Sequence, residues 1–309
     1  MNNTAGNSEH AEIVDVAPRD GFQAIDEPLP TKTKIEIIEG LIRAGCKRIE
    51  FGSFVSPRAI PQMADMGKIA EHFRDTDGVR LSALVPNLKG ADAAVAHGVT
   101  DLVYVFSASE EHNQRNVRRS VAESLEELRA VQSRLDALAG FHLRVNVATS
   151  FDCPFAGPIS LERLRQALSP VWDISPQAEI GLCDTTGRAN PQQVGRYFRR
   201  LMAECPSSET TWAFHGHDTF GLGVANALFA YEEGVRVFDA SAAGLGGCPF
   251  APGATGNTAT EDLVFALHEA GIGTGIDLMS LLSVADRIAE LPGGVTGGHI
   301  RVVPRERVA

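Results

Sequence analysis

The feature that most constrains this chain is a regular alternation of short, β-branched apolar runs with longer amphipathic segments. Eight of these runs are apolar almost without interruption, as is typical of parallel strands buried on both faces. We therefore predict strands at Glu12–Val16, Arg48–Phe51, Leu81–Val85, Leu102–Phe106, Leu143–Ala148, Glu179–Leu182, Thr211–His215 and Val237–Ala240.

The segments between the runs carry apolar residues at helical spacing. They predict helices at Lys32–Ala44, Val117–Leu138, Ser160–Trp172, Pro191–Ala203, Leu222–Glu233, Thr260–Ala270 and Asp277–Glu290. Gly45 is positioned to end the first helix. Thr258 and Glu261 have the spacing of a capping box and predict the start of the helix at Thr260.

Eight strand–helix units in 309 residues favour an α/β fold, a (β/α)₈ TIM barrel with an extra C-terminal helix. An open, doubly wound sheet is the alternative. It is less favoured because no Gly-x-Gly-x-x-Gly follows the first strand, where a dinucleotide site would lie. We predict a disordered N-terminal tail at residues 1–10, one barrel domain at 11–292 and a flexible C-terminal tail at 293–309.

Composition narrows the choice of partners and compartment. The formal net charge of −11 argues against a nucleic-acid partner, which would need clustered Lys and Arg. Five scattered cysteines without a Cys-x-x-Cys pair fit a reducing compartment better than a disulfide framework. The first ten residues lack the apolar core of a signal peptide, and no apolar stretch is long enough to cross a membrane. We therefore expect a cytoplasmic protein with no membrane partner.

Two histidines close the seventh predicted strand, in His215-Gly216-His217. Residues two apart on a strand point to the same side, so both imidazoles can bind one metal ion. A hydrogen-bonded histidine pair at a barrel rim is the alternative for this motif alone. Asp15 and Asp20 flank the end of the first strand, where a carboxylate can complete the metal site because functional residues of a barrel gather at strand ends.

Two further charged residues lie near the same predicted rim. Arg19 is a fixed cation that can stabilise an oxyanion. Glu50 ends the second strand, and a carboxylate there is costly to bury unless it is paired or linked to a metal. An ion pair between Glu50 and Arg19 is the structural alternative.

The eighth strand is followed by a loop with five glycines between Gly244 and Gly256. Such a loop has wide backbone freedom and can close over a ligand as a lid. Cys248 lies inside it, and Asn257 lies at its end with an amide oxygen that can coordinate a metal. Oxygen and nitrogen ligands without a thiolate suit Mg²⁺ or Mn²⁺ and tolerate Zn²⁺ or Co²⁺.

Together these motifs resemble the 3-hydroxy-3-methylglutaryl-CoA (HMG-CoA) lyase family of metal-dependent barrel lyases, from about Ile13 to Asp286. The matching stretches are Pro18-Arg19-Asp20-Gly21, Ser53-Phe54-Val55-Ser56-Pro57, Pro61-Gln62-Met63, Pro86-Asn87-Leu88-Lys89-Gly90, His215-x-His217-Asp218-Thr219, Ala243-Gly244-Leu245-Gly246-Gly247-Cys248-Pro249 and Asn257-x-Ala259-Thr260-Glu261-Asp262-Leu263.

The resemblance implies a retro-Claisen cleavage of HMG-CoA, or of a close 3-hydroxyacyl-CoA, to acetyl-CoA and a 3-oxo acid. It also implies a homo-oligomer, either a dimer or a tetramer. By the same resemblance Arg19 stabilises the enolate, Glu50 supports Arg19 and the metal, Cys248 takes part in proton transfer and Asp184 lies close to the reacting hydroxyl. The implied metal ligands are Asp20, His215, His217 and Asn257, and the implied substrate contacts are Gln23 and Ser53.

The chain departs from the family pattern in the expected pocket. Ala24-Ile25 stands where the family has Asn-Glu, and the segment from Val145 to Ser150 replaces Gly-Tyr-Val-Ser-Cys-Ala, so that Asn146 takes the place of an aromatic residue. Citramalyl-CoA or a longer-branched glutaryl-CoA is therefore an alternative substrate.

Two other functions compete with the lyase. A Claisen-type condensing synthase is less favoured, because such enzymes carry long C-terminal regions and this chain ends some 20 residues after its last predicted helix. A barrel that only senses metal and CoA esters has little reason to keep both metal ligands and proton-transfer groups.

Overall fold

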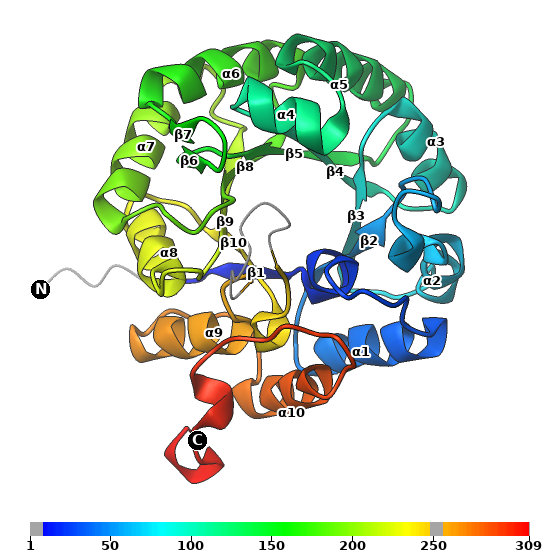
Figure 1. Cartoon of the computed structure of the whole chain (residues 1–309), viewed down its shortest axis with the longest axis vertical. Helices are drawn as coiled ribbons and strands as arrows, with labels where there is room; N and C mark the ends of the chain where they lie inside the picture. The colour runs from blue at the N-terminus through cyan, green and yellow to red at the C-terminus, as the bar shows by residue number, and fades with distance from the viewer. Residues whose placement is uncertain (1–8, 248–255, 309) are drawn as a thin grey trace, which may run out of the picture.

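All eight predicted runs form parallel strands, which close into a barrel in the order β1-β10-β9-β8-β5-β4-β3-β2 (Figure 1). The computed structural model describes residues 9–247 and 256–308. The TIM-barrel prediction is confirmed. The strands are β1 (Glu12–Asp15), β2 (Arg48–Ser53), β3 (Arg80–Val85), β4 (Asp101–Ser107), β5 (His142–Ala148), β8 (Glu179–Asp184), β9 (Thr211–Gly216) and β10 (Val237–Ala240), and a short antiparallel pair, β6 (Asp152–Cys153) and β7 (Gly157–Pro158), follows β5.

Helices form a ring around the barrel and cover its outer face (Figure 1). The extra helix α10 lies outside α1 and α9, as Figure 1 shows. No helix in the described part of the chain is long and apolar enough to cross a membrane. The helices are α1 (Thr31–Arg43), α2 (Met66–His72), α3 (Leu88–Ala96), α4 (Glu110–Val117), α5 (Val121–Asp136), α6 (Leu161–Ile174), α7 (Pro191–Glu204), α8 (Gly223–Glu232), α9 (Thr260–Glu269) and α10 (Leu278–Ala289).

Two local predictions need correction. The helix predicted at Val117–Leu138 is instead α5, which begins at Val121 behind a capping box of Ser120 and Glu123. The capping box predicted for Thr258 and Glu261 is wrong, because tertiary partners use both side chains. Thr258 Oγ1 donates to the Gly216 carbonyl at 2.9 Å, and Glu261 Oε2 accepts from the Ala243 N–H at 3.0 Å. Ala259 is the N-cap of α9 and makes no side-chain cap.

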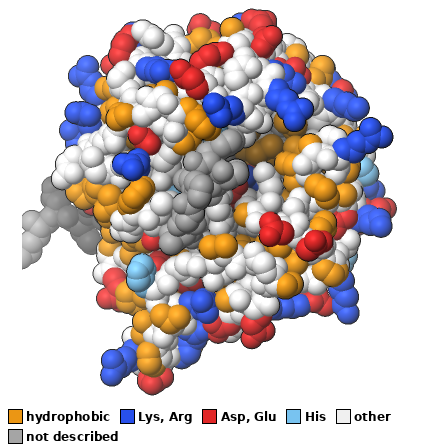
Figure 2. Space-filling model, viewed as in Figure 1, with side chains coloured by type: hydrophobic (Ala, Val, Ile, Leu, Met, Phe, Trp, Pro, Cys, Tyr) orange, Lys and Arg blue, Asp and Glu red, His pale blue; other side chains and the backbone are white. Residues whose placement is uncertain are grey.

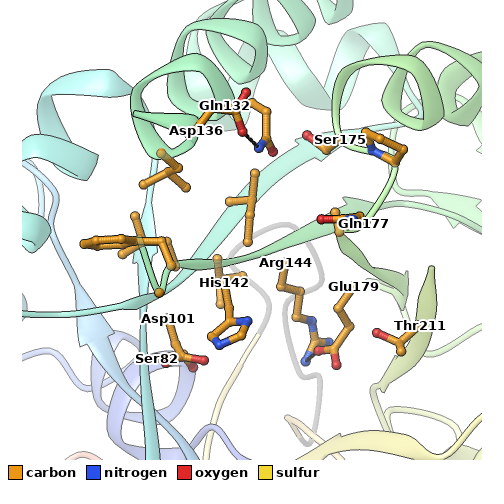
Figure 3. Close-up of a pocket in the computed structure, with 18 of the residues that line it drawn as sticks. Ser82, Asp101, Gln132, Asp136, His142, Arg144, Ser175, Gln177, Glu179 and Thr211 are labelled. Carbon is orange, nitrogen blue, oxygen red and sulfur yellow. Dashed lines mark hydrogen bonds and ion pairs between the residues drawn. The ribbon is translucent and has the colours of Figure 1, made fainter. Parts of the chain in front are cut away.

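Charged side chains fill the half of the barrel interior that lies towards the N-terminal ends of the strands. Arg48 and Arg144 are buried there, and both make ion pairs with Glu179, Arg48 at 2.8 Å and Arg144 at 3.5 Å. A polar cavity of about 580 Å³ lies at this N-terminal end of the barrel, and Figure 3 shows the head groups of Arg144 and Glu179 side by side there. The three arginines that line it are each paired with a carboxylate. Active sites of this fold lie at the opposite end of the barrel.

Residues 293–308 follow α10 and contact the barrel. Gly297 N–H donates to the Ala243 carbonyl at 2.9 Å, and the Gly246 N–H donates to the Val295 carbonyl at 3.3 Å. The backbone N–H of His299 also donates to the Asp262 carboxylate at 2.8 Å. The segment predicted as a flexible tail therefore lies against the base of the glycine-rich loop.

Candidate active site

Arg19 and Asp20 lie directly after β1, on the single π-helical turn η1 (Ala17–Gly21). Pro18 favours this abrupt change of direction because its ring fixes φ and it has no N–H to leave unpaired. The Asp20 N–H donates to the Val16 carbonyl at 2.8 Å, which ties the turn to the strand end. The turn thus directs two charged side chains into the mouth of the barrel.

A cavity of about 220 Å³ lies at this C-terminal end of the strands. It is open to solvent, and Figure 2, viewed onto the same end, shows the face hollowed near its centre. One side of the cavity is charged and the other is largely apolar. The side with charged residues and histidines is formed by Arg19, Asp20, His215 and His217, and the apolar wall by Val55, Ile60, Leu84, Pro86, Val105 and Ala148.

Asp20, His215 and His217 form a cluster whose potential ligand atoms all lie within 4.8 Å of one another. His217 Nε2 is 3.9 Å from Asp20 Oδ2, and the two imidazole rings are 5.2 Å apart between centroids. Burial and the neighbouring His215 lower the pKa of His217 to about 4, which keeps its ring neutral and able to bind a metal at pH 7. The geometry allows these three side chains to hold one metal ion.

The charge of Asp20 suits the same purpose. Burial alone would raise its pKa, but the Arg19 guanidinium and the two histidines lower it to about 2. Asp20 is therefore an anion at any pH at which the protein is expected to work. An anionic oxygen beside two imidazoles is a favourable donor set for a divalent cation.

Asn257 joins the cluster through backbone pairing, because Asn257 and His217 form an isolated antiparallel bridge. Its Nδ2 donates to Asp20 Oδ2 at 2.9 Å and to the Leu245 carbonyl at 3.2 Å. Its Oδ1 is buried and has no hydrogen-bond partner among the described residues. A buried acceptor without a donor is costly, so this oxygen fits a cation held next to Asp20.

Arg19 is held rigidly by two carboxylates. Its Nε donates to Glu50 Oε1 at 2.6 Å, and its Nη1 donates to Asp20 Oδ1 at 2.5 Å. Glu50 is fully buried, and its second oxygen has no partner in the described part of the chain. The expected pairing of Glu50 with Arg19 is therefore present, and it leaves other N–H groups of the guanidinium available to the cavity.

An ion-paired network beneath the cluster was not predicted from the sequence. His215 Nδ1 lies 3.1 Å from Asp239 Oδ2, and Arg144 donates to both oxygens of Asp239, at 2.7 and 2.8 Å. Burial would raise the pKa of Asp239, but Arg144 and His215 lower it well below its usual range. Asp239 therefore accepts from His215 Nδ1 and directs Nε2 towards the cluster. The only signal for this network in the sequence was the presence of two charged residues, Arg144 and Asp239, inside apolar strands.

This network carries a prediction for metal affinity. Asp239→Asn places an amide N–H against the N–H groups of Arg144 or His215, so His215 loses its fixed orientation. We expect the dissociation constant for Mn²⁺, measured by calorimetry, to rise about 10–100-fold. Asp101→Asn is the matched control, because Asp101 accepts from Arg80 at the opposite end of the barrel. Equal Mn²⁺ affinity in both variants would contradict the role of Asp239.

The remaining predicted site residues are placed as follows. Gln23 lines the cavity. Ser53 is buried and is not among the residues that line it. Asp184 does not line it either: its carboxylate accepts from the Ala189 N–H at 3.2 Å, and the preceding residue, Cys183, faces the cavity because neighbouring strand residues alternate. Cys248 lies outside the described residues.

Comparison with known proteins identifies the family of this chain. The HMGL-like family model matches residues 10–288. The (R)-citramalyl-CoA lyase of Chloroflexus aurantiacus is 42% identical over 297 residues, covering 92% of each chain, and the hydroxymethylglutaryl-CoA lyase of Pseudomonas mevalonii is 37% identical over 278 residues, covering 90% of this chain and 91% of the relative.

A solved structure gives the same result. The HMG-CoA lyase of Acinetobacter baumannii, in complex with coenzyme A and 3-methylmalate, has a TM-score of 0.89 and 39% identity and covers 96% of both chains. The chain therefore belongs to the HMGL-like family, which confirms both the resemblance seen in its sequence and the prediction of a carbon–carbon lyase.

Proposed function

We propose that this protein catalyses a divalent-metal-dependent retro-Claisen cleavage of a branched 3-hydroxyacyl-CoA. The observation that carries the proposal is the position of Arg19, which lines the same cavity as the Asp20–His215–His217 cluster and contacts Asp20 directly. A site with only the metal-type cluster, by which we mean Asp20, His215 and His217, would suit many reactions. A buried, immobilised guanidinium beside it suits one in which negative charge develops on an oxygen.

The metal would be held by Asp20, His215, His217 and Asn257, and we propose Mg²⁺ or Mn²⁺ because two of these ligands offer oxygen. When bound, it lowers the pKa of the substrate hydroxyl and orients that group. The residues of the chain supply the rest of the site. His217 is kept neutral by burial, and Asp20 is kept anionic by Arg19.

Cleavage transfers the proton of the C3 hydroxyl to water in the solvent-open cavity, and C3 becomes a carbonyl carbon as the C2–C3 bond breaks. The electron pair of that bond passes to C2, which gives the enolate of acetyl-CoA. Arg19 stabilises the enolate oxygen, because its Nε and one Nη1 hydrogen are committed to Glu50 and Asp20 and the guanidinium is therefore pre-oriented. We propose that Cys248 takes part in returning a proton to C2, which completes acetyl-CoA.

HMG-CoA is the first candidate substrate and citramalyl-CoA the second. Two observations support citramalyl-CoA as the second candidate. Asn146 lines the cavity where the family has an aromatic residue, and the chain is 42% identical to a relative named for that substrate. The two differ by one methylene between C3 and the carboxylate. The homo-oligomer and the cytoplasmic location stay predictions, which sedimentation and cell fractionation can test.

The decisive experiment is a substrate screen by mass spectrometry. HMG-CoA, both enantiomers of citramalyl-CoA and a longer-branched glutaryl-CoA are incubated with the protein and Mg²⁺ or Mn²⁺. We expect metal-dependent release of acetyl-CoA from at least one of them and none in the presence of EDTA. Formation of condensation products from acetyl-CoA and a 2-oxo acid, without any cleavage, would instead identify a synthase. Binding of the esters without turnover would identify a sensor.

A further inference from the structure

The side-chain amide of Asn146 has a single orientation in this structure. Asn146 lies on β5 and is 3% exposed, and its Oδ1 accepts from Arg144 Nε at 2.7 Å. Arg144 can only donate, so the atom that faces it must be the oxygen of the amide. Arg144 is itself fixed by its two hydrogen bonds to Asp239. The amide nitrogen of Asn146 therefore points away from the guanidinium.

The neighbouring strand is built to allow this orientation. Gly181 on β8 is the register partner of Asn146. A Cβ atom at Gly181 would lie 2.1 Å from Asn146 Oδ1 and 2.9 Å from Arg144 Nη2. Any larger residue at position 181 would displace the amide, the guanidinium or both. Glycine here leaves the space that holds the Arg144–Asn146 hydrogen bond in place.

The Asn146 nitrogen is a donor that the protein leaves open to the cavity. Asn146 is one of the residues that line the cavity of about 220 Å³, and among the described residues no acceptor is found for Nδ2. A polar N–H in a largely buried position is most stable when it has a partner. The partner can be a ligand atom, because the same cavity contains Arg19 and the metal-type cluster.

The surroundings of Asn146 differ from those of Arg19. β5 lies opposite β1 in the closed barrel, so Asn146 and Arg19 face each other across the cavity. Near Asn146 is Thr185, whose Oγ1 accepts from the Thr149 N–H at 2.8 Å and keeps its own hydrogen to donate. Cys183, whose thiol pKa burial raises, also lines the cavity and is the register partner of His215 on the next strand. This side of the cavity therefore offers uncharged donors, whereas the other side offers a cation and metal ligands.

We propose that Asn146 is a specificity-determining residue whose Nδ2 donates to a carboxylate oxygen of the acid half of the substrate, the fragment that leaves as an oxo acid. This inference rests on the proposed function, which assigns the thioester half to Arg19. The acid half then extends across the cavity to the uncharged donors around Asn146. A substrate without an acceptor at this position leaves the amide unpaired and is discriminated against.

The test compares Asn146→Asp and Asn146→Leu with the wild-type protein loaded with Mn²⁺. In Asn146→Asp one oxygen still accepts from Arg144, and the other replaces the donor with a negative charge that repels a carboxylate. Asn146→Leu removes the donor without adding charge. We expect KM for the cleaved substrate, and the inhibition constant of its oxo-acid product, to rise by at least about tenfold in both variants. The inhibition constant of acetyl-CoA, which has no acid half, should stay within about twofold.

Gln192→Glu is the matched control, because Gln192 is an exposed amide on α7 that does not line the cavity. It should leave the oxo-acid inhibition constant unchanged. The proposal is overturned if both Asn146 variants keep the wild-type oxo-acid constant, or if the acetyl-CoA constant rises equally. Should wild-type protein cleave none of the CoA esters, the proposed function fails. Calorimetric titration of pyruvate and acetoacetate into the same proteins still decides the role of Asn146.

Discussion

Arg19→Met is expected to lower kcat by roughly three orders of magnitude while the protein keeps its metal. The guanidinium is positioned for an oxygen that gains negative charge during cleavage, so its loss destabilises the transition state more than bound substrate. Methionine has no charge to offer but fills a similar volume. Metal content, measured by elemental analysis, should stay at the wild-type level, because Asp20 and both histidines remain.

Losing a buried cation can also destabilise the fold, since Glu50 is left without its partner. Arg48→Met controls for this effect, because Arg48 is a buried arginine that is paired with Glu12 and Glu179 away from the cavity. Both variants should melt at a lower temperature, but only Arg19→Met should lose turnover at a temperature where each is folded. A near-normal kcat in Arg19→Met would remove Arg19 from the mechanism.

His215→Ala and Asp20→Ala are expected to lose metal and activity together. Each removes one of the three clustered ligand atoms, and the affinity for Mn²⁺ should fall by more than about 100-fold, since even residues that only orient a ligating histidine are worth 10–100-fold. Calorimetry with Mn²⁺ measures this loss independently of turnover. Thermal unfolding followed by circular dichroism shows that the barrel is intact.

The matched control is His142→Ala, which removes an exposed histidine at the start of β5, at the other end of the barrel. It should bind Mn²⁺ and turn over substrate like the wild type. The metal assignment is wrong if His215→Ala binds Mn²⁺ with unchanged affinity. It is also wrong if full activity persists after removal of divalent ions.

The strands could be predicted because their signal is local. A run such as Leu102–Phe106 is apolar on both faces of the strand, and this pattern does not depend on which strands become neighbours. The same holds for Gly45, whose φ of +99° fits the predicted helix end. The metal-type cluster could also be predicted, because Asp20, His215 and His217 lie at or just after strand ends and a barrel brings all strand ends to one rim.

What could not be predicted depends on partners distant in the chain. Arg144 and Asp239 are 95 residues apart, and only the barrel register places Asp239 beside His215. Thr258 and Glu261 match a local capping pattern, yet hydrogen bonds to Gly216 and Ala243 use both side chains. Asp184 illustrates the same limit, since a one-residue change of strand phase decides which of Cys183 and Asp184 faces the cavity.

The single guanidinium of Arg144 has a consequence for how this family can diverge. It donates to Asn146 with Nε and to Asp239 with both Nη groups, so one side chain holds a residue that lines the cavity and a residue that contacts His215. Substitutions at positions 146, 181 and 239 should therefore be epistatic rather than additive. A lineage that acquires a new acid half is expected to change these positions together, because each change alone disturbs metal affinity as well as substrate preference.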